Sequence, residues 1–440
     1  MEACRKPERV PMENTDWFNY GGLYRDILLV RLPPIFIKDW FLRLVPDGSF
    51  STIWLYVEVA AEQAEGENPA VTSLSREGPM GRAVSPCLRE LDVLLRIPEL
   101  GVNVSCPVRE GKGRATFRAK STLWSPEKPF LYDVDLSLFG ASSPGKVRDR
   151  IGFREIRVEG REILLNGKPV FLKGTSVHED HFLLGKTTNE ETIRSTIRHL
   201  RELNGNYLRL SHYPHDRRFA QILDEEGVLL WEEIPVYWAI DFTNPRTYAD
   251  AENQLTELVR RDRNRASVIV WSVDNENADT DARFFFMARL AQQARAPDGS
   301  RPVSAACLIN HVKLAIEDRL AGVLDIVGVN EYYGWYDPDF EKLNRILENS
   351  NPQKPVIICE FGGGARTGHR GTVDELFTED IQAWLYERQL GGIKACPYIR
   401  GLSPWILYDF RCPRQLNRYQ EGFNRKGLID GDRRKKETGL

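Results

Sequence analysis

Hydrophobic and polar positions follow two different patterns along the chain. Between residues 27 and 155, short runs of alternating or β-branched residues are separated by turn-rich stretches, and such runs include Ile37–Val45, Ser51–Val59 and Leu131–Leu138. Alternation over these lengths predicts strands that bury one face, and the spacing of the turns favours an antiparallel β-sandwich. The stretch 62–82 is polar and rich in Gly and Pro, so a long exposed loop is expected there.

The pattern changes after the segment Gly152–Ile156, where short buried-type strands alternate with longer segments of helical period. Eight strands are expected, over residues 170–176, 206–211, 228–234, 268–274, 303–308, 325–330, 355–360 and 404–410. Eight strands with intervening helices predict a closed (β/α)8 barrel, in which functional side chains lie at the carboxyl ends of the strands.

Three predicted helices illustrate this second pattern. Thr188 and Glu191 have the spacing of a capping box, and a stripe of apolar residues follows them. The stripe consists of Ile193, Ile197, Leu200 and Leu203. A second helix is expected from about Arg217 to Gly227, and a third is expected around Leu258.

Composition narrows the classes of partner. The 440 residues are 42% hydrophobic and 28% charged, with a formal net charge of -3, as in an ordinary globular protein of two or three domains. This charge balance excludes nucleic acid as the expected partner. No run approaches the roughly 20 apolar residues of a membrane span, and the start lacks the apolar core of a signal peptide, so we expect a cytoplasmic protein without a membrane partner.

The seven cysteines are scattered, without a Cys-x-x-Cys pair or a Cys/His spacing. This distribution argues against a zinc site and against a complete disulfide framework. We interpret the cysteines mostly as buried thiols.

Two glutamates stand where a barrel carries its chemistry. Glu276 ends the fourth predicted strand and Glu360 ends the seventh, so both are expected to point into one central cup. Retaining glycoside hydrolysis needs such a pair, with one carboxylic acid to protonate the leaving oxygen and one carboxylate about 5 to 5.5 Å away to attack the anomeric carbon. By composition alone, Glu276 also fits a solvated strand-end carboxylate and Glu360 also fits a structural ion pair with an arginine.

Several separated motifs resemble those of one enzyme family. Arg261–Val273 followed by Asn275-Glu276 resembles the acid/base signature of glycoside hydrolase family 2, and Ile358–Gly362 is similar to its nucleophile signature. Other segments match the family where the chain enters the barrel, namely Gly152–Arg154, Leu165–Lys168, His178–Asp180 and Arg209–Pro214. Within the family, the chain looks most like the β-glucuronidase branch.

This resemblance covers nearly the whole chain and implies a domain order. Residues 1–30 look like the remnant of a sugar-binding jelly roll, residues 31–155 like an immunoglobulin-like β-sandwich, and residues 156–440 like the catalytic (β/α)8 barrel. Most of the jelly roll is missing, which is the largest departure from the family. Asp16 matches a position that contacts sugar hydroxyls in the family, although a simple loop or capping aspartate is the alternative.

The resemblance also implies a binding site for a uronic acid. Asn424 and Lys426 stand where β-glucuronidases carry an Asn-x-Lys pair, and a lysine charge with an amide donor suits a carboxylate. A solvated run of basic residues at this end of the chain is the alternative. An arginine found four residues before the asparagine in well-studied members of the branch is Gln420 here, and Arg418 is a candidate substitute.

Other residues are assigned to the sugar pocket by the same resemblance. Asn275 is expected to hold the 2-hydroxyl of the sugar, an interaction that strengthens at the transition state. Histidines and aromatic residues are expected to line the pocket, with structural or core packing roles as the alternatives. They are His178, His212, Tyr332, Tyr336 and Trp405.

Asp274 occupies a position where the family usually has a small residue. Residues two apart on a strand share a face, so we expect Asp274 to lie near Glu276 and to raise its pKa by charge repulsion.

The sequence therefore predicts a retaining exo-β-glycosidase that hydrolyses terminal β-D-glucuronides, with Glu360 as nucleophile and Glu276 as general acid/base. The expected partner is a small-molecule or oligosaccharide β-glycoside, no metal or organic cofactor is expected, and the resemblance implies a homo-oligomer. The nearest alternatives are a β-galactosidase, β-mannosidase or β-galacturonidase with the same mechanism. A non-catalytic carbohydrate-binding protein is the alternative of another class, because the jelly roll is cut short.

Overall fold

The computed structural model describes residues 8–61, 91–140 and 145–436, which form two compact units. The first unit contains the residues up to Asp26, the short segment Ser125–Pro129 and all residues from Ile156 onward. The second contains Ile27–Trp124 and Phe130–Glu155. The predicted loop over 62–82 lies outside the described residues.

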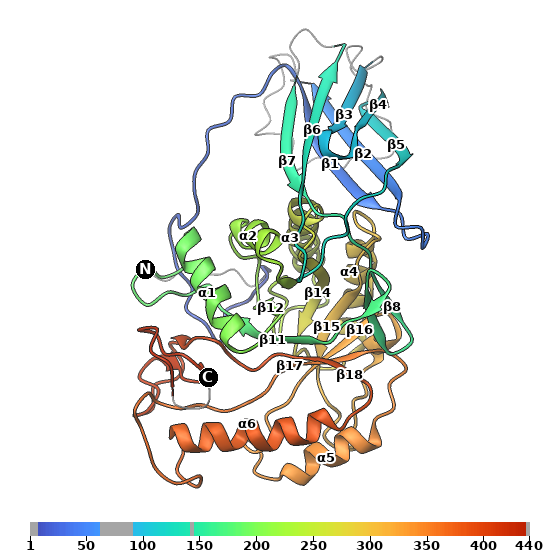
Figure 1. Cartoon of the computed structure of the whole chain (residues 1–440). Helices are drawn as coiled ribbons and strands as arrows, with labels where there is room; N and C mark the ends of the chain where they lie inside the picture. Colours follow the sequence, from blue (N-terminus) through green and yellow to red (C-terminus); the bar gives the residue numbers. More distant parts are fainter. Residues whose placement is uncertain (1–7, 62–90, 141–144, 437–440) are drawn as a thin grey trace. The chain divides into compact units, whose positions relative to one another are not determined.

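The second unit is an antiparallel β domain (Figure 1). Its sheet has the strand order β1-β2-β5-β4-β3-β6-β7. The strands are β1 (Ile35–Leu44), β2 (Thr52–Ala61), β3 (Leu91–Ile97), β4 (Val102–Arg109), β5 (Lys112–Arg118), β6 (Tyr132–Phe139) and β7 (Lys146–Ile151).

Strict alternation builds the core of this domain. Along β2, Ile53, Leu55, Val57 and Val59 are buried while their neighbours are partly exposed, because successive side chains of a strand point to opposite faces. The predicted antiparallel sandwich is confirmed, and its described strands form one continuous hydrogen-bonded sheet.

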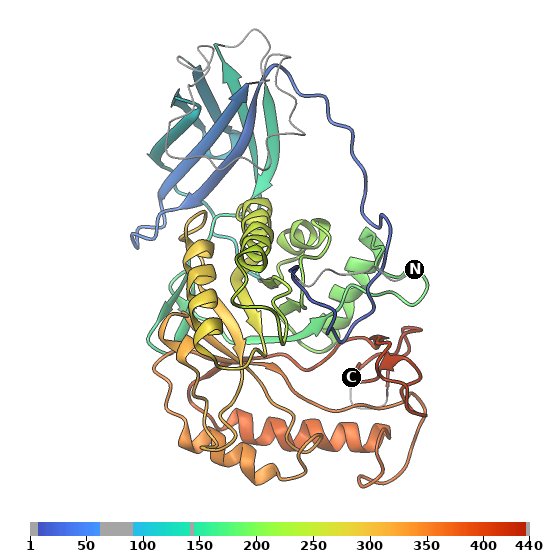
Figure 2. The same ribbon diagram turned by 180° about the vertical axis from the view of Figure 1, so that it is seen from behind.

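The first unit is built around a closed parallel barrel whose strands run in the order β11 to β18, as Figures 1 and 2 show from opposite sides. The strands are β11 (Leu172–Val177), β12 (Tyr207–Leu210), β13 (Leu229–Glu233), β14 (Val268–Asn275), β15 (Val303–Cys307), β16 (Ile326–Asn330), β17 (Val356–Glu360) and β18 (Ile399–Leu402). β18 pairs with both β17 and β11, so the barrel closes. The predicted fold class is confirmed.

Helices follow most of the barrel strands, and α5 and α6 lie side by side in both views (Figures 1 and 2). They are α1 (Glu190–Glu202), α2 (Arg218–Glu226), α3 (Pro245–Asp262), α4 (Asp281–Arg295), α5 (Phe340–Asn349) and α6 (Glu379–Lys394). A 3-10 turn, η4 (Arg319–Gly322), joins β15 to β16, and another, η3 (Pro98–Leu100), follows β3 in the second unit. Short antiparallel strands flank the barrel: β8 (Ile156–Glu159), β9 (Glu162–Leu165), β10 (Lys168–Pro169), β19 (Phe410–Arg411) and β20 (Phe423–Asn424).

Seven of the eight predicted barrel strands are confirmed within a few residues, and the eighth is wrong. The last strand is Ile399–Leu402 instead of 404–410. It is short and contains Arg400 and Gly401, so it lacks the apolar run that marks the other strands. The residues 404–410 are apolar for another reason, because Trp405 and Ile406 pack in an aromatic cluster beyond the strand end.

One predicted helix start is also wrong. The N-cap of α1 is Asn189, whose side-chain oxygen accepts a 2.9 Å hydrogen bond from the backbone N–H of Thr192. Thr188 lies one residue outside the helix, so the capping box does not form. The end of α2 at Gly227 is confirmed, since this residue adopts the left-handed conformation at φ +69° that glycine favours.

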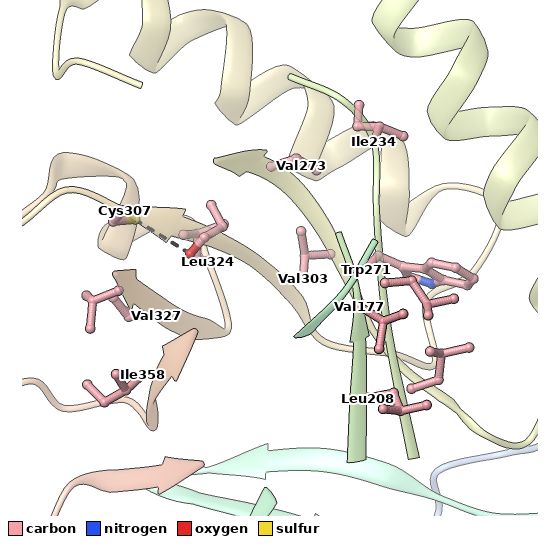
Figure 3. Packing of buried hydrophobic residues seen from close by; sticks show 14 of the residues in the cluster. Val177, Leu208, Ile234, Trp271, Val273, Val303, Cys307, Leu324, Val327 and Ile358 are labelled. Carbon is pink, nitrogen blue, oxygen red and sulfur yellow. Dashed lines mark hydrogen bonds between the residues drawn. The ribbon is translucent and has the colours of Figure 1, made fainter. Parts of the chain in front are cut away.

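Apolar side chains fill the space between the barrel strands and the helices around them. Figure 3 shows part of this cluster, in which Trp271 and Val273 of β14 pack among residues of several other strands. Burial of this continuous core fixes the barrel and leaves the polar strand ends to line one mouth. Across the three described ranges, none of the helices combines the length and the apolar character needed to cross a membrane.

Candidate active site

A cavity of about 380 Å³ opens at the carboxyl ends of the barrel strands within the first unit. Its walls come from the residues at and after the ends of β13 to β17, from the segment near Asp16 and from the stretch after β18. The lining residues are Asp16, Tyr237, Trp238, Glu276, Leu308, Ile309, His311, Asn330, Glu331, Tyr332, Tyr333, Tyr336, Asp337, Glu360, Trp405 and Lys426.

Glu276 follows β14 directly and lines this cavity. Its backbone has a left-handed φ of +58°, which ends the strand and breaks the strand's side-chain alternation. Its Oε2 accepts a 2.8 Å hydrogen bond from the indole N–H of Trp238. Burial raises the pKa of Glu276 above its ordinary value, and the nearby Glu360 carboxylate raises it further. The raised pKa suits Glu276 to the role of a proton donor.

Glu360 is the last residue of β17 and lines the same cavity. Its Oε1 accepts a 2.7 Å hydrogen bond from Nη1 of Arg209, and its Oε2 accepts one of 2.7 Å from the hydroxyl of Tyr332. Each carboxylate oxygen is held by a donor, so the group has a fixed orientation in the cavity.

Arg209, on β12, organises the floor of the site and is fully buried. Besides Glu360, it donates to both carboxylate oxygens of Glu233 at 3.1 Å and to Oδ1 of Asn275 at 2.7 Å. Burial alone lowers the pKa of an arginine, but the carboxylates of Glu233 and Glu360 outweigh it and hold the pKa of Arg209 well above its ordinary value. The guanidinium group is therefore a permanent cation beneath the nucleophile candidate.

The segment before Asp26 contributes Asp16 to the cavity and Trp17 to its support. Asp16 accepts hydrogen bonds of 3.2 Å from the amide of Gln415 and 3.0 Å from the amide of Asn424, and the Cys412 thiol donates to it at 2.9 Å. Trp17 is 4% exposed and packs in an aromatic cluster at the barrel mouth. This segment is thus part of the site in the described structure.

Lys426 and Asn424 have different positions. Lys426 lines the cavity and is 6% exposed, with its ammonium group hydrogen-bonded to the hydroxyl of Tyr336 and 4.7 Å from the ring centre of Tyr332. Asn424 lies behind the wall, where its amide nitrogen donates to Asp16 and its Oδ1 accepts a 3.1 Å hydrogen bond from the backbone N–H of Lys426. Asn424 therefore links Asp16 to Lys426.

Gln420 stands at the position of the family's arginine and Arg418 is the candidate substitute, and neither residue lines the cavity. Gln420 donates from its amide to Gln415, which in turn holds Asp16. Arg418 is exposed and packs over the ring of Tyr419.

Three other predicted residues lie just behind the cavity wall. His212 stacks on Trp405 at a ring distance of 4.9 Å, and its Nδ1 is 2.7 Å from Oε1 of Glu233. His178 packs against the same tryptophan, and burial holds its pKa well below the ordinary value, so its imidazole is neutral. The amide nitrogen of Asn275 is buried, and it has no hydrogen-bond partner within the part of the chain that the structure describes. That nitrogen is the donor expected for the 2-hydroxyl of a sugar.

The expectation for Asp274 is wrong. β14 carries one extra residue relative to β15 between Ser272 and Asn275, so the alternation shifts at this bulge. Asp274 consequently pairs with Arg283 of α4 at 2.6 Å, while Asn275 points to Arg209. Glu276 owes its raised pKa to burial and Glu360, not to Asp274.

Sequence reasoning missed several residues of the site. Tyr237 and Trp238 lie in the loop after β13, with three residues between the strand end and Tyr237, and an aromatic pair in a loop that follows a barrel strand was the available signal. Arg209 had no predicted role of its own, although a charged residue inside the apolar run Tyr207–Leu210 is itself a signal. Glu331, between Asn330 at the end of β16 and Tyr332, had no predicted role. Among the described residues, no group of three or more His, Cys, Asp or Glu side chains is arranged to hold a metal ion.

Comparison with known proteins identifies the family. Residues 156–438 match the family described as "Glycosyl hydrolases family 2, TIM barrel domain". The chain belongs to glycosyl hydrolase family 2. The match covers more than half of the 440 residues and coincides with the barrel that carries both glutamates.

The curated relatives of this family 2 chain include β-glucuronidases. It is 27% identical over 445 residues to one from Paenibacillus borealis, and the alignment covers 96% of this chain and 69% of that protein. It is 28% identical over 464 residues to the one from Homo sapiens, and the alignment covers 100% of this chain and 66% of that protein. The chain thus spans about two thirds of the length of these relatives.

Solved structures show the same architecture. A β-galacturonidase from Eisenbergiella tayi bound to galacturonate is 25% identical with a TM-score of 0.85, covering 99% of this chain and 76% of that one. A β-glucuronidase from Ruminococcus gnavus in complex with D-glucuronic acid is 25% identical with a TM-score of 0.79, covering 98% and 74%.

Proposed function

We propose that this family 2 chain is a retaining exo-β-uronidase, with terminal β-D-glucuronides as its substrates. The observation that carries the proposal is that Glu276, Glu360 and Lys426 line one cavity. The two glutamates supply the chemistry of glycoside cleavage, and the lysine supplies a cation for the carboxylate of the sugar.

The two carboxyl groups have the environments that their roles require. Glu360 is anchored by Arg209 and Tyr332, so its carboxylate is aimed at one point of the cavity. There it attacks the anomeric carbon and forms a glycosyl ester, while Glu276 gives its proton to the departing oxygen. Glu276, now ionised, takes a proton from water as the water oxygen attacks the anomeric carbon, and the bond from that carbon to Glu360 breaks and frees the Glu360 carboxylate. Two inversions at one carbon give retention.

Lys426 supports a uronic acid as the sugar. Two tyrosine rings and the cavity wall hold its ammonium group, which leaves a fixed charge facing the pocket. A charge-assisted hydrogen bond to a carboxylate is stronger than one to a neutral hydroxyl. Asp16 faces the same space and accepts hydrogen bonds, as sugar hydroxyls require.

A second candidate is the hydrolysis of β-galacturonides. The same lysine suits either uronic acid, because the two sugars differ only in the configuration at C4. The likeness to the Eisenbergiella tayi β-galacturonidase, with its TM-score of 0.85, favours keeping this candidate. The non-catalytic alternative is less favoured, because both glutamates line one cavity, Asp16 lines it with them and Trp17 packs in the aromatic cluster beside it.

One set of nitrophenyl glycosides tests the proposal. We expect turnover of the β-glucuronide, and no turnover by the Glu360→Gln variant. Proton NMR of the first product should show the β-anomer, because the mechanism retains configuration. A faster β-galacturonide would select the second candidate, and a faster β-galactoside would overturn the uronic acid assignment.

Lys426→Met tests the recognition of the carboxylate. We expect kcat/KM for the uronide to fall by roughly 10- to 100-fold, the range for a hydrogen bond to a charged group. Lys435→Met is the matched control, since Lys435 belongs to the same basic stretch but is 47% exposed and pairs with Glu202. Equal losses in both variants would indicate a general charge effect.

A further inference from the structure

Glu331 is a buried carboxyl group that the proposed mechanism does not use. It follows β16, lines the cavity and is 3% exposed. Its Oε2 accepts a 3.2 Å hydrogen bond from the backbone N–H of Tyr333. Its Oε1 is buried without a hydrogen-bond partner in the described ranges of the chain.

An unpaired buried oxygen of this kind is costly, so its presence in a cavity wall requires an explanation. Burial raises the pKa of Glu331 to about 8, and only the backbone N–H of Tyr333 opposes the shift. At neutral pH the group is therefore mostly a neutral carboxylic acid with one O–H to donate. A ligand in the cavity can accept that hydrogen bond.

The position of Glu331 indicates which part of a ligand it meets. Glu276 follows β14 and Glu360 ends β17, so the ends of β15 and β16 lie between them around the barrel. Glu331 belongs to this arc, together with Leu308 and Ile309 after β15. Of the neighbouring side chains after β16, Tyr332 donates to Glu360 and Tyr336 is hydrogen-bonded to Lys426, so these two face the residues suited to the sugar, whereas the hydrogen bond of Glu331 runs to the backbone of Tyr333.

Part of this arc is not assigned to the sugar, and that part includes Glu331, Leu308 and Ile309. The wall is apolar at Leu308 and Ile309, and it carries buried oxygens without a hydrogen-bond partner in the described ranges at Glu331 and at Asn330. Apolar residues combined with a few placed polar groups are typical of a site that fixes the orientation of a ligand.

We propose that the carboxyl group of Glu331 hydrogen-bonds an oxygen atom of the leaving group, so that preferred substrates carry a hydroxylated leaving group such as a second sugar. The inference rests on the proposed function and deepens it, because it names the class of leaving group.

The test compares two substrates that share the uronic acid. One is the phenyl β-uronide, whose leaving group has no oxygen beyond the glycosidic one, and the other is a disaccharide with the same uronic acid β-linked to a hexose. For Glu331→Leu we expect the ratio of kcat/KM, disaccharide over phenyl, to fall about tenfold, as for a lost hydrogen bond that leaves a polar partner unpaired. Glu331→Gln keeps a neutral donor and should retain most of the ratio.

The exposed Glu348 on α5 provides the matched control. Glu348→Leu removes a carboxyl group outside the cavity and should not change the ratio. If Glu331→Leu lowers both substrates equally, or changes neither, the inference is overturned.

A pH profile separates contact from a structural role. The wild-type ratio should fall above about pH 8, where Glu331 ionises and loses its donor, and Glu331→Gln should lack this fall. The other titratable groups of this region are His311, Tyr332, Tyr333, Tyr336 and Asp337, and the wild type and Glu331→Gln both retain them. A fall that persists in Glu331→Gln would therefore contradict the inference.

Failure of the proposed function gives a different result. If the wild-type chain cleaves neither substrate, the uronidase proposal fails. Calorimetric binding of the disaccharide to wild type and to Glu331→Leu then tests the inference alone. Weaker binding by the variant supports the contact, and equal binding overturns it.

Discussion

Nη1 of Arg209 donates a 2.7 Å hydrogen bond to Oε1 of Glu360, and the arginine side chain is fully buried. The same guanidinium group holds Glu233 and Asn275, so one side chain of β12 joins the ends of β13, β14 and β17. A planar group with five donors in a rigid fork can make these contacts together, and a lysine ammonium cannot.

Arg209→Lys is expected to keep the positive charge but to lose the forked arrangement of donors that holds Glu360, Glu233 and Asn275. We predict that kcat for the nitrophenyl uronide falls about 100-fold, since a misplacement of roughly 1 Å at the reacting groups has this effect. KM should change much less, because Lys426 and Asp16 are untouched. Steady-state kinetics on the folded variant give the answer, and an unchanged kcat would show that Glu360 does not depend on this anchor.

Trp238 controls the pKa of the proton donor. Its indole N–H donates to Oε2 of Glu276 at 2.8 Å, which favours the ionised form and partly offsets the rise in pKa caused by burial and by Glu360. Trp238→Phe removes this donor, so the pKa of Glu276 should rise. Because Glu276 must be protonated to act as an acid, the basic limb of the kcat/KM profile should move to higher pH. Trp384→Phe on α6 is the control, and a basic limb that stays or moves down would contradict the assignment.

Trp17 holds the segment that carries Asp16. Its ring lies 4.9 Å from that of Tyr237 and 5.7 Å from that of His212. We predict that Trp17→Ala lowers the free energy of unfolding by about 3 to 5 kcal/mol, as for other buried aromatic truncations, and raises KM because Asp16 is released. Urea unfolding and kinetics measure the two effects. Leu23→Ala is the control, since Leu23 is 83% exposed, and equal effects in both variants would refute the role of Trp17.

The barrel was predictable because its strands are marked by continuous apolar runs. Val356–Glu360 is such a run, and the prediction there is accurate to one residue. An apolar run does not mark a strand that is short and polar, such as Ile399–Leu402. It also misleads where apolar residues pack at the cavity wall instead of in a strand, as Trp405 does.

The site was predictable where a side chain lies at a strand end and less so where contacts join distant segments. The bulge that turns Asp274 away from Glu276 depends on pairing with β15, which the local sequence does not encode. Asn424 meets Asp16 across 408 positions of the chain, so its place behind the wall follows only from the fold. The unpaired oxygen of Glu331 is likewise a property of its surroundings.

Asp274 gives a prediction about stability. Burial raises its pKa from 3.8 to about 7, although Arg283 opposes the shift and Asp318 adds to it. The folded chain therefore binds a proton that the unfolded chain has lost between about pH 4 and pH 7. The stability that this proton contributes is complete below about pH 4 and is lost as the pH rises through 7.

Asp274→Asn removes this titration. From pH 5 to pH 8, the wild type should lose stability relative to the variant, by on the order of a few kcal/mol in the free energy of unfolding. Urea unfolding at both pH values measures the difference, with the exposed Asp432→Asn as control. The pH profile of kcat/KM should be the same in Asp274→Asn as in the wild type, because Asp274 faces Arg283 on α4. A shifted activity profile with an unchanged stability profile would instead place Asp274 beside Glu276 and contradict the bulge.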